Sequence, residues 1–152
     1  MEKLNKNFAD FLRLLTEKKV KYLVIGGYAV AFHGFVRATG DLDVFVEISD
    51  ENAEKLVSTF SDFGFADPAL TKELFLEKGK IVRIGVPPIR IEILNDISGV
   101  CFSDCYKDRI EEKIGELTIA FIDLNNLIKN KESSGRPKDL ADVHELTKER
   151  NT

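Results

Sequence analysis

Two aspartates and a glutamate have the types and spacing needed to bind a metal ion. Asp41 and Asp43 are two residues apart in a segment that alternates like a β-strand, so their carboxylates share one face. Like charges placed side by side repel each other, and a divalent cation relieves that repulsion. Glu92 lies between two isoleucines in a later β-rich segment and would join the aspartates from a neighbouring strand. Mg²⁺ binds one or two carboxylates together with phosphate oxygens, so these acids predict a two-metal site for phosphoryl transfer.

Each of these acids also has a simpler interpretation. An Asp-x-Asp pair is common on a solvated strand face, and Glu92 could be an exposed residue paired with Arg90 on the same face. Apolar neighbours such as Leu42 and Val44 favour the metal site, because they indicate a core strand whose end enters a pocket. The metal-site hypothesis requires Glu92 to lie on the same side of the sheet as both aspartates.

A diglycine, Gly26-Gly27, separates the apolar run 22–25 from a short helical segment. Backbone without side chains can approach a ligand closely, and N–H groups at the start of a helix favour a phosphate. Taken alone, the pair is explained as well by the steric needs of a tight strand–helix turn. Its position just before the acidic segment favours a phosphate site over a purely steric turn.

Composition narrows the functional classes. The chain has 152 residues, 43% of them hydrophobic and 32% charged, which predicts one globular domain over residues 1–152. A net charge of −4 gives no strong signal for a nucleic-acid partner, since broad nucleic-acid surfaces carry a basic excess. The apolar runs are too short to span a bilayer and the first seven residues are mostly polar, so we expect no membrane association and a cytoplasmic protein.

The two cysteines support that expectation. Cys101 and Cys105 stand four residues apart, and on a helix they would share a face without the geometry of a disulfide. Two thiols with no nearby histidine cannot complete a zinc site. We therefore interpret both as reduced, buried, small apolar groups.

The remaining pattern predicts a mixed α/β arrangement in which helices and strands intermingle along the chain. Helices are expected over residues 3–18, 28–33, 50–63, 125–131 and 138–148. Strands are expected over residues 22–25, 41–48, 81–86, 89–94 and 117–122. Pro87-Pro88 would form the turn of a hairpin, and residues 95–110 a loop or short helix. The fold class is thus α/β (α+β), a mixed sheet flanked by helices, with two helices at the carboxyl end.

Taken together, these residues resemble the nucleotidyltransferase superfamily of the polymerase-β type, and most closely its small prokaryotic, uncharacterised or toxin–antitoxin-associated members. The shared signature reads Gly-Gly-x-Ala-x-x-x-His-Gly, then Arg-x-Thr-x-Asp-x-Asp. Here it comprises Gly26, Gly27, Ala29, His33, Gly34, Arg37, Thr39, Asp41 and Asp43. Residues 135–142 are similar to an Arg-x-Lys-Asp-x-x-Asp element near the carboxyl end of these proteins, so the resemblance extends over residues 22–146.

The resemblance implies an Mg²⁺-dependent enzyme that transfers a nucleoside monophosphate from a nucleoside triphosphate such as ATP to an acceptor hydroxyl. The resemblance leaves the acceptor open between RNA, protein and a small molecule. It also implies that a partner protein or a homodimer could complete the cleft, and that the chain could belong to a toxin–antitoxin pair. The implied catalytic and metal-binding residues are Asp41, Asp43 and Glu92. The implied phosphate-binding residues are Gly26, Gly27, Arg37, Thr39 and Lys138.

Two departures from the family pattern support an alternative hypothesis. Many active members have Gly-Ser where this chain has Gly26-Gly27, and their third acid is commonly Asp where this chain has Glu92. These differences favour a nucleotide-binding or partner-binding module that kept the fold without turnover, whereas the three acids favour an enzyme. His33 is interpreted as structural, bonded to a backbone carbonyl, and Arg37 as equally suited to a triphosphate or to a structural role.

Overall fold

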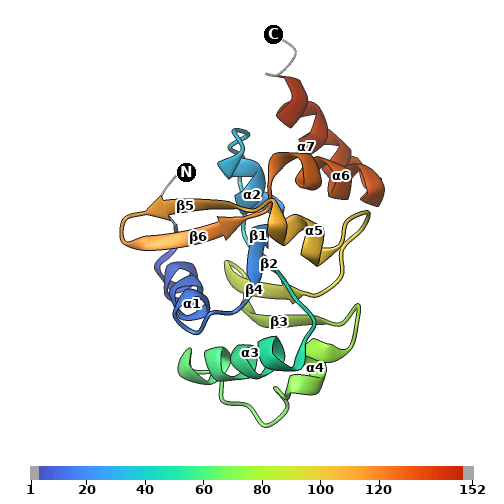
Figure 1. Cartoon of the computed structure of the whole chain (residues 1–152). Coiled ribbons are helices and arrows are strands. Elements are labelled where there is room, and N and C mark those ends of the chain that lie inside the picture. The colour runs from blue at the N-terminus through green and yellow to red at the C-terminus, as the bar shows by residue number, and fades with distance from the viewer. Residues whose placement is uncertain (1–3, 149–152) are drawn as a thin grey trace.

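The centre of the fold is a six-stranded mixed β-sheet (Figure 1). The computed structural model describes residues 4–148. The strands are β1 (Tyr22–Ile25), β2 (Leu42–Val46), β3 (Ile81–Val86), β4 (Ile89–Leu94), β5 (Ile110–Ile114) and β6 (Leu117–Phe121). Their spatial order is β3-β4-β2-β1-β6-β5, with β2–β4 and β1–β6 parallel and the other neighbouring pairs antiparallel. The predicted mixed sheet is therefore confirmed.

Seven helices of the described residues surround this sheet. They are α1 (Lys6–Glu17), α2 (Gly26–Phe32), α3 (Asp50–Asp62), α4 (Lys72–Leu76), α5 (Phe102–Lys107), α6 (Leu124–Ser134) and α7 (Pro137–Lys148). Side chains of Asn5, Ser49 and Asp123 accept hydrogen bonds from backbone N–H groups at the starts of α1, α3 and α6, which fixes where those helices begin. The helix expected over residues 3–18 corresponds to α1, but its first residue lies outside the described residues.

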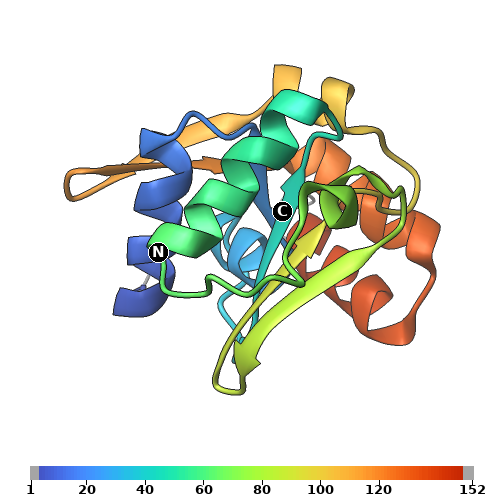
Figure 2. The same cartoon turned by 90° about the horizontal axis from the view of Figure 1, so that it is seen from below.

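The two faces of the sheet have different surroundings. In β4, Ile91 and Ile93 are buried on one face, and the alternation of the strand places Arg90 and Glu92 on the other. α1 and α3 pack together on the Ile91 side and contribute Phe11 and other side chains to the core. Helices α3 and α4 lie at the bottom of Figure 1 and α6 and α7 at its top right, and the view from below in Figure 2 shows α3 and α4 in front of the sheet.

The sequence analysis did not predict two elements, α4 and β5. Helix α4 has only five residues, too few to give a periodic pattern. Strand β5 reads Ile-Glu-Glu-Lys-Ile at the edge of the sheet, where none of its residues is fully buried, so it lacks the apolar alternation of an inner strand. In Figure 1 the β5–β6 hairpin extends away from the helices at its turn. Helix α2 also begins two residues earlier than predicted, at Gly26.

The prediction for the cysteines is wrong at one position. Both thiols are free, and Cys105 is buried in the core, but Cys101 is exposed. The reason is that Cys101 precedes α5 as its N-cap residue, so the two cysteines do not lie on one buried helical stripe.

Across residues 4–148, no helix combines the length and apolar character needed to cross a membrane.

Candidate active site

Two adjacent strands, β2 and β4, bring the predicted acids onto one face of the sheet. Asp43 in β2 is the register partner of Glu92 in β4, and Glu92 in turn is opposite Arg83 in β3. Residues in one such row point to the same face, so Glu92 lies on the same side as Asp43. Asp41 immediately precedes β2 and lies two residues before Asp43. The condition that the sequence hypothesis placed on Glu92 is met.

These acids form the floor of a cleft of about 830 Å³. One wall comes from the sheet and the loop after β4, and the facing wall from α6 and the start of α7. The cleft contains seven of the eight predicted site residues: Gly26, Gly27, Arg37, Asp41, Asp43, Glu92 and Lys138. Thr39 does not line it, because its side chain lies behind Gly27. The structure thus collects residues from four separate parts of the chain into one cavity.

Asp43 has the most unusual environment of the three acids. Its Oδ1 is buried and has no hydrogen-bond partner among residues 4–148. Burial, together with the nearby charges of Glu92 and Asp41, raises the pKa of Asp43 from 3.8 to about 7, although Lys131 and Lys138 act in the opposite direction. An unpaired, buried carboxylate oxygen is costly to the fold, so a bound cation would supply the missing partner.

We expect Asp43 to make the metal-free protein less stable as the pH rises. The pKa of Asp43 is higher in the folded state than in the unfolded state. The contribution of Asp43 to the free energy of unfolding is therefore fully present below about pH 3.8 and decreases as the pH approaches 7. This pKa difference corresponds to a free energy on the order of 4 kcal/mol. Urea unfolding in EDTA at pH 5 and pH 8 should therefore show that the stability of Asp43→Asn increases relative to that of the wild type at the higher pH. An unchanged difference between the two proteins at both pH values would contradict the raised pKa.

The diglycine turn is required by its contacts. Gly26 has a φ of +67°, and a Cβ added there would collide with Oδ2 of Asp43. A Cβ on Gly27 would collide with Oγ1 of Thr39. Ile25, the residue before α2, has no polar side-chain atom to cap the helix, so the first N–H groups of α2 stand uncapped by a side chain beside the cleft. The turn thus brings bare backbone against the acidic floor.

Arg37 is held by an acid that the sequence analysis did not assign to it. Its Nε and Nη2 donate to Oδ1 and Oδ2 of Asp142, each at 2.9 Å, and its Nη1 donates to the Ala38 carbonyl. This paired geometry is strong and well oriented. Arg37 therefore ties the segment before β2 to α7, which agrees with the structural interpretation, although its side chain still borders the cleft.

Lys131 is the centre of the same network and was missed from the sequence. It is buried, and its Nζ lies 3.2 Å from Asp139 Oδ1 and 2.9 Å from Asp142 Oδ2. Burial alone would raise the pKa of Asp142, but hydrogen bonds from Arg37 and Lys131 outweigh it and lower that pKa. The pKa of Asp139 is lowered in the same way, against burial, by Ser134 and Lys131.

The sequence contained a signal for Lys131. It follows Leu127 by one helical turn and so falls on the buried stripe of α6, where a lysine requires acidic partners. Asp139 and Asp142 are three residues apart on one face of α7 and provide them. Lys138 differs from these residues because it is exposed in the cleft and has no ion-pair partner among residues 4–148. A ligand in the cleft can therefore reach Lys138 without breaking an ion pair.

Glu92 is paired with two arginines in the structure. Its Oε1 accepts a hydrogen bond from Arg83 Nε at 3.1 Å and lies 3.8 Å from Arg90 Nη1. The simpler interpretation of Glu92 as a partner of Arg90 is thus also correct in part. Within the described part of the chain, no group of three or more Asp, Glu, His or Cys side chains is arranged to hold one ion.

His33 lies outside this site. His33 Nε2 is 2.7 Å from the Ile122 carbonyl oxygen, which confirms its structural interpretation.

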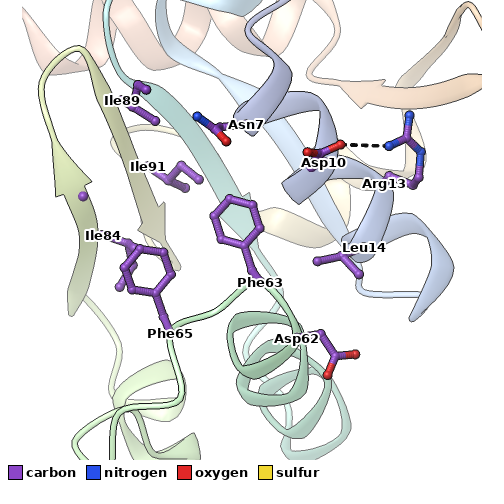
Figure 3. A pocket seen from close by; sticks show the side chains of 11 residues that line it. Asn7, Asp10, Arg13, Leu14, Asp62, Phe63, Phe65, Ile84, Ile89 and Ile91 are labelled. Atoms are coloured by element: carbon purple, nitrogen blue, oxygen red, sulfur yellow. Dashed lines mark hydrogen bonds and ion pairs between the residues drawn. The ribbon is translucent and has the colours of Figure 1, made fainter.

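A groove of about 600 Å³ opens on the opposite face of the sheet, between α1, the end of α3 and the β3–β4 hairpin. Figure 3 shows Phe63 and Phe65 pointing across it toward Ile84 and Ile91, with the Asp10–Arg13 ion pair at its rim. No predicted site residue lines this groove.

A mixed sheet with a diglycine turn and acids on adjacent strands is the arrangement of the nucleotidyltransferase superfamily. A family model described as a nucleotidyltransferase of unknown function (DUF6036) matches residues 2–148, and the chain belongs to this family. A comparison with curated proteins gives no match.

Two solved structures share the fold. The first is a candidate nucleotidyltransferase from Thermotoga maritima, with a TM-score of 0.62 and 18% sequence identity, covering 93% of this chain and 91% of that one. The second is an antigenic nucleotidyltransferase-like protein from Paracoccidioides brasiliensis, with a TM-score of 0.54 and 11% identity, covering 94% of this chain and 77% of that one. At these identities the likeness concerns the fold alone, and the chemistry must be argued from the cleft.

Proposed function

We propose that the protein is a divalent-cation-dependent nucleotidyltransferase that moves a nucleoside monophosphate from a nucleoside triphosphate to an acceptor hydroxyl. The observation that carries the proposal is Asp43 Oδ1, a buried carboxylate oxygen in the cleft that has no hydrogen-bond partner within the described part of the chain and lies beside Asp41 and Glu92. A carboxylate so placed costs stability, and binding of a cation would offset that cost. Family membership supports the same chemistry.

The residues present fit a magnesium site. Asp41 and Asp43 supply hard oxygen ligands, and Mg²⁺ needs only one or two protein carboxylates when phosphate oxygens complete its shell. When bound there, Mg²⁺ would neutralise the triphosphate and the charge that develops during transfer. Glu92 provides a third carboxylate once it separates from its arginines.

The other cleft residues divide the remaining tasks. Bare backbone at Gly26 and Gly27 lets phosphate oxygens approach the N–H groups at the start of α2, and Lys138 adds a positive charge from the facing wall. The acceptor oxygen forms a bond to the α-phosphorus, the bond from that phosphorus to the oxygen bridging to the β-phosphate breaks, and pyrophosphate leaves. Glu92 receives the proton of the acceptor hydroxyl. Arg37 and Thr39 hold the turn and the acidic segment in place behind these groups.

A binding module without turnover is the second candidate, and one observation favours it. Glu92 is engaged by Arg83 and Arg90, and the three acids do not converge on one point among the described residues. A protein with this site could bind a nucleotide through Gly26, Gly27 and Lys138 and transfer nothing. The role in a toxin–antitoxin pair, the identity of the nucleotide and the identity of the acceptor stay predictions from the resemblance.

Labelled nucleotides separate the two candidates. Calorimetry with each of the four ribonucleoside triphosphates, with Mg²⁺ and then with EDTA, should show binding that requires the cation. Incubation of the protein with an α-³²P-labelled triphosphate and a cell extract should then transfer label to an acceptor and release pyrophosphate. Cation-dependent binding without transfer would support the binding module, and binding that is equal in EDTA would reject the metal site.

A further inference from the structure

Arg90 occupies an unusual position between two of the acids. Its Nη1 lies 3.7 Å from Asp41 Oδ2 and 3.8 Å from Glu92 Oε1, so one guanidinium neutralises both carboxylates. The side chains are only partly exposed, at 32% for Arg90, 31% for Asp41 and 17% for Glu92. Arg90 therefore places a positive charge between two carboxylates of the candidate metal site. A bound metal cation would supply its charge at the same carboxylates.

The contacts of Arg90 are also loose compared with those of Arg37, an arginine that lines the cleft. Among residues 4–148, no hydrogen bond at 3.5 Å or less joins its side chain to either acid. Arg37, by contrast, binds both oxygens of Asp142 at 2.9 Å. An ion pair without a hydrogen bond gives up little when it separates, so Arg90 can leave the acids at low cost whereas Arg37 cannot.

From this geometry we infer that Arg90 is an internal counter-cation, which occupies the space between Asp41 and Glu92 in the metal-free protein and is displaced when a divalent cation binds. The inference rests on the proposed function, because it assumes that these acids bind a metal. It assigns Arg90 a positioning role: the arginine keeps the two carboxylates from repelling each other until the cation arrives. It also makes cation binding weaker than the acids alone would give.

Manganese binding measured by calorimetry tests this role without any transfer activity. Arg90→Gln removes the competing charge, so the dissociation constant for Mn²⁺ should fall about tenfold, since opposite charges about 4 Å apart interact by one to a few kcal/mol near a protein surface. Arg90→Lys keeps the charge and should stay within about threefold of the wild type. Arg109→Gln is the matched control, because Arg109 is equally exposed, at 31%, and is paired with Glu111 outside the cleft.

The outcomes separate the two levels of inference. Tighter Mn²⁺ binding in Arg90→Gln but not in Arg109→Gln supports the role of Arg90, including the case in which the wild type binds too weakly to measure. Equal or weaker binding in Arg90→Gln, with binding still lost in Asp43→Asn, overturns the counter-cation and leaves the metal site intact. Absence of binding in both the wild type and Arg90→Gln overturns the counter-cation and the metal site together. Thermal unfolding in EDTA verifies that each variant is folded.

Discussion

Replacing Asp43 by asparagine is expected to abolish the Mg²⁺-dependent binding of nucleoside triphosphate and to lower any transfer rate by about 10³-fold. Asparagine keeps the shape of the side chain and removes its charge from the floor of the cleft. A carboxylate about 4 Å from a cation contributes on the order of 4 kcal/mol at the effective dielectric of a protein surface, which corresponds to that factor. Calorimetry with Mg²⁺ and triphosphate measures the binding, and release of pyrophosphate measures the transfer.

This loss should not come from unfolding. Asp43 is strained electrostatically in the metal-free fold, so Asp43→Asn should be at least as stable as the wild type in EDTA above pH 7. Asp10→Asn serves as the control, because Asp10 lies on the opposite face at the rim of the apolar groove and is paired with Arg13. If Asp43→Asn bound triphosphate with the same dependence on Mg²⁺ as Asp10→Asn, Asp43 would not be a metal ligand.

The parts of the fold that the sequence predicts are those whose pattern depends on burial. Strand β1, the β3–β4 hairpin and helix α1 match their expected positions because each has an apolar face in the core. Strand β5 and helix α4 were missed because one is an exposed edge strand and the other a single short helix. A local window of sequence holds no information on which strand lies at the edge of the sheet, since that depends on the order of the whole sheet.

The same distinction holds for the site. Local spacing places Asp41 and Asp43 on one face, and the family resemblance associates Glu92 with them, so these predictions depend on neighbouring residues or on a known pattern. Ion pairs over long separations are different. The partner of Arg37 is Asp142, 105 residues further along the chain, and no periodicity links the two. A sequence contains the charges of such a network but not their pairing, which the three-dimensional arrangement decides.

Lys131→Met is expected to destabilise the protein by about 3 kcal/mol at pH 7, the lower end of the range for removing one partner from a buried ion pair. The lysine is almost wholly buried and neutralises both Asp139 and Asp142. The lower end applies because each aspartate keeps an arginine, Arg136 for Asp139 and Arg37 for Asp142. Urea unfolding of the wild type and the variant gives the difference directly.

The pH dependence of that difference identifies its electrostatic origin. The pKa values of Asp139 and Asp142 are lowered in the folded wild type, so the stability they contribute is present above about pH 4 and is lost as the pH falls further. The gap between wild type and Lys131→Met should therefore narrow at pH 3. Lys55→Met, which removes an exposed pair with Glu51, should have a much smaller effect at either pH, because solvent screens that pair. A gap of equal size at pH 3 and pH 7 would mean that the charge of Lys131 is not the source of the stabilisation.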